Sequence, residues 1–413
     1  MLAGAAAAAV AAALPAFLRR PRTASATTPR LIHDPAKHLH VAAGLEYVVL
    51  DRTGELMRDG YFVPGAPDGM GAFARADGMI VLMRNHELWP SDAPIAGWRA
   101  EAKPKHLYDP KSLGAVTRLV VDPKELRVVE SNLVLAGTNV NCAGGSSPFG
   151  WLSCEEETSP DHGYVFACPI DAREVIEPVP IRAYGRFKHE AASVDPETMI
   201  AYLTEDRDDG CFYRFVPASP ERPFEGRLEA LRLEGGEADT GPLAAGQERR
   251  IGWVELGPEL PHDDSLRSLA LSRGAARVRR GEGMFFARGP RGAEVFFSAT
   301  AGGPLGRGQV IRLRPEGDGG QLEVVWSGEG ATGLEMPDNL VAAPDGRLFL
   351  AEDHGGVCGL RMLQPDGRVA TIAESAQPGE LSGVALSPGG DVLFANLQRQ
   401  GLTVAIRGDF ASL

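Results

Sequence analysis

The sequence lacks the basic surface by which proteins bind nucleic acid. Lys and Arg number 42 against 55 Asp and Glu, which gives a formal net charge of -13 at pH 7. Because binding to phosphate backbones depends on clustered basic residues, we expect no nucleic-acid partner. An acidic chain of this kind is better suited to hold cations, which would neutralise part of its charge.

Several familiar site patterns are missing as well. The five cysteines are an odd number without a CxxC pair, so a zinc finger and complete internal disulfide pairing are both excluded. No GxSxG elbow, phosphate-binding P-loop or dinucleotide fingerprint occurs in a usable context. The sequence therefore gives no support to a serine hydrolase or a nucleotide-binding fold.

Long stretches of helical periodicity are also absent. From Leu45 onward, short runs alternate apolar and polar residues and are broken by turn-forming residues, among them 50 Gly and 31 Pro in the whole chain. This pattern is typical of many short strands joined by tight turns. The apolar fraction of 44% is enough for a sizeable core.

The first 28 residues stand apart from this pattern. An Ala-rich apolar run ends in a cluster of arginines and is followed by Ala24-Ser25-Ala26. The run is too short and Ala-rich for a membrane span, and the A-x-A pattern is typical of an export cleavage site. We expect residues 1–28 to be a twin-arginine leader whose arginine pair lies upstream of Met1, or else a disordered segment. We expect residues 29–413 to form one monomeric, periplasmic or secreted domain without stable membrane insertion.

One unit recurs along the rest of the chain. It consists of a polar entry, an apolar strand, a tight turn and a second strand that ends in polar or acidic residues. Its copies lie at 70–87, 137–157, 189–206, 282–300, 337–354 and 381–397. Equivalent residues of the last two copies, Leu340 and Val384, are 44 positions apart, the spacing of a four-stranded propeller blade. Six copies predict an all-β, six-bladed β-propeller with loop insertions.

The polar ends of the copies are expected to gather where the innermost strands meet. Aligning the second strands places Cys154, Glu205 and Glu352 at one position. The next position then holds Glu155, Asp206 and Asp353. The entries to the first strands supply further polar residues, namely Asn141, Cys142, Glu190, Glu282 and Asp338.

Crowded carboxylates repel one another unless cations lie between them. Many hard oxygen ligands suit Ca²⁺, whereas a thiolate from Cys142 would suit a transition metal such as iron. The alternative for each single acid is that it caps a strand or pairs with arginine. Arg280 lies two residues before Glu282 and so faces the same side of a strand, where its guanidinium could bind phosphate oxygens. Alternatively, Arg280 belongs to a solvated basic loop.

The strings NCAGG at 141–145, WLSCEE at 151–156 and GRFKHEAASVDPETMIAYLTEDRDDGCFYRFVP at 185–217 closely resemble the PhoX-type alkaline phosphatases. The similarity extends from about Leu45 to Asn396. The resemblance implies a six-bladed propeller, exported by the twin-arginine route, that hydrolyses phosphomonoesters with iron and calcium ions. At residues 262–283 the chain departs from the family pattern. The resemblance therefore does not imply which phosphate esters it accepts.

The resemblance also implies residue roles. Cys142 is similar to the iron-bound thiolate, Glu190 and Glu282 to further metal ligands, and Arg280 to the phosphate-binding arginine. Asn139 or Asn141 is implied as a second phosphate contact. The family's acidic calcium and iron ligands are matched by Glu155, Glu205, Asp206, Asp338 and Glu352. Two alternatives stay open: a calcium-dependent propeller lactonase or esterase, and a propeller that binds a partner without catalysis.

Overall fold

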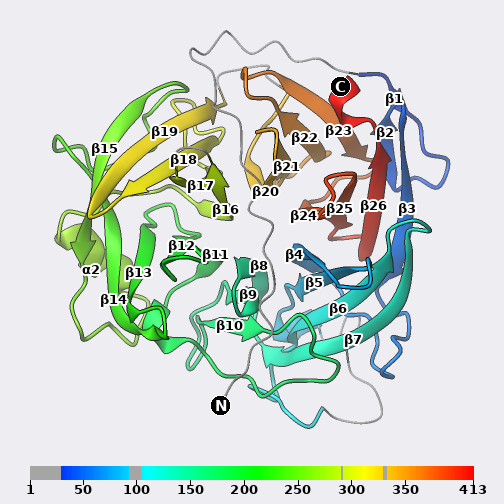
Figure 1. Cartoon of the computed structure of the whole chain (residues 1–413), viewed down its shortest axis with the longest axis horizontal. Coiled ribbons are helices and arrows are strands. Elements are labelled where there is room, and N and C mark those ends of the chain that lie inside the picture. The colour runs from blue at the N-terminus through cyan, green and yellow to red at the C-terminus, as the bar shows by residue number, and fades with distance from the viewer. Residues whose placement is uncertain (1–28, 93–97, 99–103, 290–291, 329–332) are drawn as a thin grey trace.

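The computed structural model describes residues 29–92, 98, 104–289, 292–328 and 333–413. Within these residues, 26 strands form five hydrogen-bonded sheets, and helical turns are few. The sheets stand around a common centre, as Figure 1 shows, so the fold is all-β and propeller-like. The expected leader over residues 1–28 lies outside the described residues.

The first sheets along the chain carry the opening copies of the repeat. One sheet consists of β4 (Pro67–Ala74), β5 (Ile80–His86), β6 (Gly114–Asp122) and β7 (Arg127–Thr138). The next consists of β8 (Asn141–Ser147), β9 (Gly150–Glu155) and β10 (Val165–Cys168). A nine-stranded sheet follows, in the order β11 (His189–Val194), β12 (Ala201–Glu205), β13 (Phe212–Ser219), β14 (Arg222–Leu233), β15 (Glu248–Glu255), β19 (Gly319–Ser327), β18 (Gln309–Glu316), β17 (Gly292–Ala299) and β16 (Gly281–Gly289).

The last two sheets take their outer strands from the N-terminal part of the chain. One has the order β20 (Pro337–Ala342), β21 (Leu348–Glu352), β22 (Gly359–Leu363), β23 (Val369–Ser375), β2 (Leu39–Ala42) and β1 (Leu31–Ile32). The other consists of β24 (Leu381–Leu386), β25 (Val392–Leu397), β26 (Leu402–Gly408) and β3 (Leu45–Arg52). The helical segments are α2 (Leu266–Ser272) and the 3₁₀ turns η1 (Pro90–Asp92), η2 (Arg182–Tyr184) and η3 (Phe410–Ser412).

The nine-stranded sheet departs from the expectation of six separate blades. Strand β15 pairs antiparallel with β19 from Glu248 opposite Glu323 to Gly252 opposite Gly319. This pairing joins two runs of strands that each end at the centre, one in β11 and the other in β16. An outer strand with unpaired backbone groups readily accepts a neighbour, and here the neighbour belongs to the same chain. The described residues thus form five sheets, one of them double.

The innermost strands close a ring. Strand β4 contacts β8, β8 contacts β11, β11 contacts β16, β16 contacts β20, β20 contacts β24, and β24 contacts β4 again. Glycines permit some of these close approaches. A Cβ on Gly69 would lie 2.5 Å from the Cα of Ala143, and one on Gly283 would lie 2.5 Å from the Cα of Asn339. The hydrophobic core also fills the space between the two halves of the nine-stranded sheet, where the rings of Phe212 in β13 and Phe297 in β17 stack.

Each inner strand also has a β-bulge near its start. The register shifts fall between Pro67/Met70, Asn141/Gly144, His189/Ala192, Gly281/Met284, Pro337/Leu340 and Ser382/Ala385. A bulge re-aims the side chains next to it, and its recurrence turns the same position of every inner strand in the same way.

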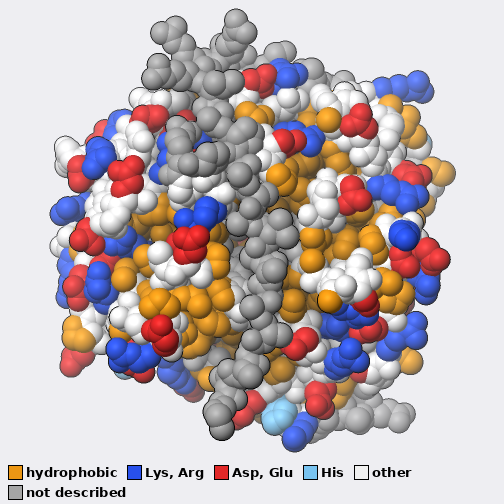
Figure 2. All heavy atoms as spheres, viewed as in Figure 1, with side chains coloured by type: hydrophobic (Ala, Val, Ile, Leu, Met, Phe, Trp, Pro, Cys, Tyr) orange, Lys and Arg blue, Asp and Glu red, His pale blue; other side chains and the backbone are white. Residues whose placement is uncertain are grey.

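On the face drawn in Figure 2, hydrophobic side chains gather toward the middle, and charged side chains are concentrated nearer the rim. No helix among the described residues has the length and apolar character needed to span a membrane.

Candidate metal centre

One backbone hydrogen bond recurs beside every inner strand. The residue after the second strand of each hairpin donates its N–H to the carbonyl of the residue before the first strand. The pairs are Glu87 to Ala66, Glu156 to Val140, Asp206 to Lys188, Thr300 to Arg280, Asp353 to Met336 and Gln398 to Glu380. We call the donors the exit positions and the acceptors the entry positions. These contacts fix both chain segments of each hairpin at the same end of the ring.

The second residue of each inner strand adds another set of side chains at this end. These second positions are Asp68, Cys142, Glu190, Glu282, Asp338 and Ser382. Five of the six are acids or a thiol, and each is followed by the bulge described above. The same local backbone therefore delivers ligand-type side chains from segments far apart in sequence to one place.

Three groups of possible ligand atoms result, each with its atoms within 4.8 Å of one another. They are Asp68, Glu87 and Cys142; Cys142, Glu156 and Glu190; and Glu190, Glu282 and Asp338. Cys142 and Glu190 each belong to two groups, so the three form one continuous cluster, which we call the acidic centre. The Sγ of Cys142 lies 3.4 Å from Oε1 of Glu190 and 3.9 Å from Oδ2 of Asp68.

When no cation is present, the acidic centre raises the pKa of its side chains, so they take up protons more readily than exposed acids do. Burial, followed by the neighbouring carboxylates, raises the pKa of Glu190 well above its ordinary value. Burial also raises the pKa of Asp68 to about 6 and that of Glu156 to about 7. The pKa of the Cys142 thiol is raised well above 9 by burial, with Asp68 and Glu190 adding to the shift. A cation among these groups would reverse this preference by stabilising the charged forms.

The donor set fits metal ions. Buried polar atoms are nearly always hydrogen-bonded, yet Oδ1 of Asp68 and Oε2 of Glu190 are buried and find no hydrogen-bond partner among the described residues. Such oxygens can serve as free ligand atoms. Carboxylate oxygens in this number suit Ca²⁺, and the single thiol in their midst suits a softer ion such as iron.

Two basic side chains lie against these acids. The guanidinium of Arg280 places Nε 2.8 Å from Oδ1 of Asp206 and Nη2 2.9 Å from Oε1 of Glu282. Its backbone is left-handed, with a φ of 50°. The Nζ of Lys188 lies 2.9 Å from Oε1 of Glu156. Arg280 and Lys188 both occupy entry positions, and Arg280 joins Asp206 to the acidic centre.

The structure places three predicted ligands, Glu155, Glu205 and Glu352, outside the three groups of possible ligand atoms. Glu155 accepts hydrogen bonds from the backbone of Asn139, Gly163 and Tyr164 and from His162. Its carboxylate is therefore fully used within its own part of the fold.

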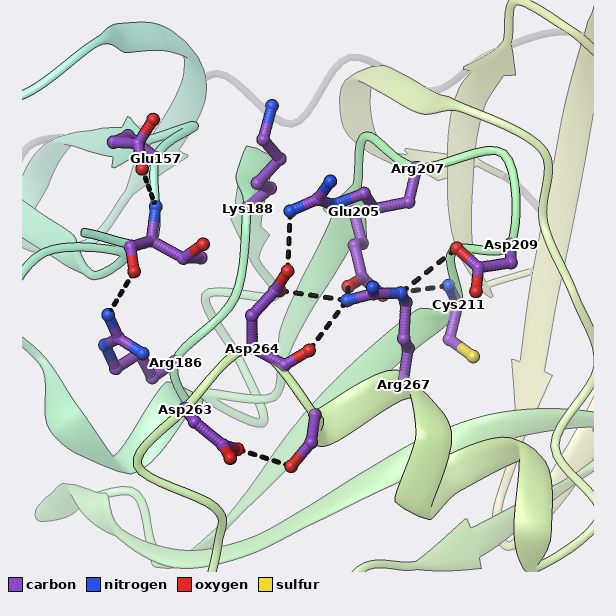
Figure 3. Close-up of polar contacts among 12 residues, drawn as sticks. Glu157, Arg186, Lys188, Glu205, Arg207, Asp209, Cys211, Asp263, Asp264 and Arg267 are labelled. Carbon is purple, nitrogen blue, oxygen red and sulfur yellow. Dashed lines mark hydrogen bonds and ion pairs between the residues drawn. The ribbon is translucent and has the colours of Figure 1, made fainter. Parts of the chain in front are cut away.

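Glu352 has the same kind of role, and Glu205 has it through one oxygen only, because its buried Oε1 has no hydrogen-bond partner among the described residues. Glu205 binds the N–H of Cys211 and the hydroxyl of Tyr213, in the region drawn in Figure 3. Glu352 binds the N–H groups of Glu335 and Gly359 and the guanidinium of Arg361. Both acids hold the loop that follows their strand.

For Glu155 the reason is a shift of one residue in the alignment of the second strands, whereas Glu205 and Glu352 were aligned with each other as observed but lie at a position that faces the loop. The observed register places Glu155 opposite Asn141, Glu205 opposite His189 and Glu352 opposite Pro337, so these three are equivalent. Each ends its strand and faces the loop, whereas the following exit residue faces the centre. Sequence reasoning thus missed Asp68, Glu87 and Glu156, three possible ligands of the acidic centre. The shared pattern of a strand-terminal residue followed by an acid could have identified Glu87 and Glu156.

The two predicted asparagines are not joined to the acidic centre by any described contact. Asn141 accepts a hydrogen bond from the hydroxyl of Thr138 and donates one to Ser153 within its own sheet. Asn139 donates from Nδ2 to Ser159, and its buried Oδ1 has no partner among the described residues. Four predicted ligands are brought together as expected: Cys142, Glu190, Glu282 and Asp338.

One known protein family matches the sequence of this chain. The family model described as alkaline phosphatase PhoX matches residues 124–401, about two thirds of the chain. The chain belongs to the PhoX alkaline phosphatase family. This membership confirms the resemblance found in the sequence. The matched range includes every residue of the acidic centre except Asp68 and Glu87. A comparison with the curated proteins finds no sequence match.

Several solved structures are similar in fold. The β-propeller domain of Cps50 (Swd1) from Myceliophteria thermophila has 12% identity and a TM-score of 0.46, with 88% of this chain and 99% of that chain covered. A periplasmic gluconolactonase of Pseudomonas aeruginosa has 14% identity and a TM-score of 0.43, with 86% and 90% covered. A gluconolactonase of Xanthomonas campestris has 12% identity and a TM-score of 0.41, with 88% and 97% covered. We draw nothing about activity from likenesses this distant.

Proposed function

We propose that this chain is a metal-dependent phosphomonoester hydrolase of the alkaline phosphatase type, which holds iron and calcium ions in its acidic centre. The observation that carries the proposal is the position of Cys142. Its thiol joins two groups of carboxylates at one end of the ring, and no other cysteine belongs to a ligand group among the described residues. Membership of the PhoX family supports the same activity.

The side chains divide between ion binding and substrate binding. The thiol of Cys142 with Glu156 and Glu190 would hold the softer ion, and the remaining acids would hold calcium. When bound, such ions neutralise charge and withdraw electrons from phosphoryl oxygens. Arg280 would bind the substrate's phosphate, since a guanidinium matches two phosphate oxygens at once.

The role of Asp206 follows from its contacts with Arg280. Its two oxygens lie 2.8 Å from Nε and 3.2 Å from Nη2 of the guanidinium. An arginine fixed in this way loses little further freedom when phosphate binds, which favours both affinity and orientation. Arg280 would then stabilise the charge that grows on the phosphoryl oxygens as the ester bond breaks.

The same proposal covers the chain as a whole. Residues 29–413 would form one monomeric domain, in which the nine-stranded sheet counts as two blades of a six-bladed propeller. The six recurring hydrogen bonds between exit and entry positions support this count. Residues 1–28 would direct export by the twin-arginine route, and the domain would act on small phosphate esters in the periplasm or outside the cell.

The test is hydrolysis of p-nitrophenyl phosphate by the protein loaded with iron and calcium. We expect Cys142→Ala and Arg280→Ala to lose about 100-fold or more in kcat/KM, because each removes a group that binds ion or phosphate directly. Cys168→Ala is the control, since Cys168 packs in the hydrophobic core away from the acidic centre. Wild-type activity in both test variants would refute the assignment. Calcium without iron in the purified protein would favour a lactonase.

A further inference from the structure

A short loop holds Arg280 from two sides. Residues 206–210 lie in the connection between β12 and β13, and the first two of them contact Arg280 in different ways. Asp206 binds the guanidinium, and the carbonyl of Arg207 accepts the backbone N–H of Arg280 at 2.8 Å. Since left-handed backbone is uncommon for residues other than glycine, the φ of 50° at Arg280 depends on contacts of this kind. The position of the loop therefore determines the position of the guanidinium.

Two residues at the start of α2 fasten the other side of this loop. Asp264 places Oδ2 2.6 Å from Nη2 of Arg207, and Arg267 places Nε 3.0 Å from Oδ1 of Asp209. Asp264 and Arg267 also bind each other, with Oδ1 and Nη1 2.9 Å apart. Figure 3 shows this pair between the loop and the helix. We call Asp264 and Arg267 the brace.

The helix that carries Arg267 is anchored in the hydrophobic core. Leu266 and Ala270 of α2 are fully buried in the core cluster that also contains Tyr213. Below the loop, Nη1 of Arg267 lies 3.7 Å from Oε1 of the buried Glu205, whose Oε2 binds the N–H of Cys211 at 3.1 Å. The brace therefore connects the core to both ends of the loop. Ion pairs in such a network contribute more than isolated surface pairs do.

We infer that Asp264 and Arg267 are positioning residues for phosphate binding, which act on Arg280 through the loop 206–210. This inference rests on the proposed function, because it takes Arg280 as the phosphate-binding group. Neither brace residue belongs to the acidic centre, so the brace sets phosphate affinity without holding an ion.

The experiment measures inorganic phosphate binding to the metal-loaded protein by calorimetry. We expect Arg267→Gln and Asp264→Asn to bind phosphate about 10-fold more weakly, the usual effect of removing a supporting contact behind a ligand. The KM for p-nitrophenyl phosphate should rise by a similar factor, while metal content stays at the wild-type level. Arg267→Lys should recover part of the affinity, because an ammonium can still pair with Asp209.

Arg273→Gln is the matched control. Arg273 follows the same helix but binds the carbonyl of Glu255, away from the loop. Phosphate affinity at the wild-type level in both brace variants would overturn the inference, as would an equal loss in Arg273→Gln with a matching fall in Tm. If a Gln variant unfolds, Asp264→Asn and Arg267→Lys decide the matter. A wild-type protein that binds phosphate without hydrolysing the ester would refute the proposed function alone, since the phosphate affinities still test the brace.

Discussion

Glu155 and Glu156 are consecutive in the chain, yet their carboxylates serve different parts of the molecule. Glu155 ends β9 and binds three backbone N–H groups and the ring of His162. Glu156 lies one position further on, next to Cys142 and Glu190 in the acidic centre. Because successive side chains of an extended chain face opposite ways, one residue separates a structural acid from a ligand.

This pair predicts two opposite phenotypes. Glu155→Gln should destabilise the protein by about 2–4 kcal/mol, because the amide group would face buried N–H donors that need an acceptor. Glu156→Gln should leave urea unfolding of the metal-free protein almost unchanged but weaken metal binding by about 10-fold or more. Urea unfolding and elemental analysis of both variants check this. Metal loss confined to Glu155→Gln would show that the assignment of the two acids is reversed.

The sequence predicts the inner hairpins well because turn residues and alternating apolar runs mark them locally. Cys142, Glu190, Glu282 and Asp338 were found because each stands at the start of such a run. Glu87 and Glu156 were missed because they follow strands whose ends the sequence does not mark, and a slip of one residue exchanges the two faces.

Features that depend on distant segments could not be found in the sequence. The bulges of the inner strands leave no local signal, and the pairing of β15 with β19 joins residues about seventy positions apart. The resemblance to the PhoX family implies Asn139 or Asn141 as a phosphate contact. Only the structure shows that the side-chain amide of Asn141 is hydrogen-bonded to Thr138 and Ser153.

Removal of bound ions should lower stability. Without cations, the carboxylates of the acidic centre repel one another or must take up protons. At free calcium about 1,000-fold above Kd, binding would contribute about 4 kcal/mol to the folded state. We expect EDTA to lower Tm by several degrees and added calcium to restore it, as followed by differential scanning fluorimetry. A Tm that EDTA leaves unchanged would favour a propeller that binds a partner without metal.

The close contact of β4 with β8 predicts a cost for any side chain at Gly69. A Cβ there would lie 2.5 Å from the Cα of Ala143, so the backbone must move. Gly69→Ala should destabilise the protein by about 2 kcal/mol or more. It should also weaken metal binding, since Asp68 and Cys142 adjoin the displaced residues. Gly355→Ala is the control, because a Cβ at Gly355 would meet nothing within 4 Å. Equal stability of the two variants would contradict the prediction.

The contacts of Asp34 predict how the stability of the N-terminal strands depends on pH. Its carboxylate accepts hydrogen bonds from the backbone of Ala36, His38 and Leu39 and from the hydroxyl of Tyr47. Burial alone would raise its pKa, but these hydrogen bonds outweigh burial and lower the pKa to about 2. The unfolded value is about 3.9. The stability from Asp34 is therefore fully present above about pH 4 and is lost as pH falls toward 2.

Asp34→Asn should accordingly lose about 1–3 kcal/mol at pH 7, since a neutral amide accepts these hydrogen bonds more weakly. Its urea midpoint should then fall less between pH 4 and pH 2 than that of the wild type. Tyr47→Phe removes one donor and should show a smaller change in the same direction. Parallel curves for wild type and Asp34→Asn in this range would contradict the role of Asp34. Because β2 and β3 complete the two C-terminal sheets, the loss of this charge would loosen the ring where N-terminal strands pair with C-terminal ones.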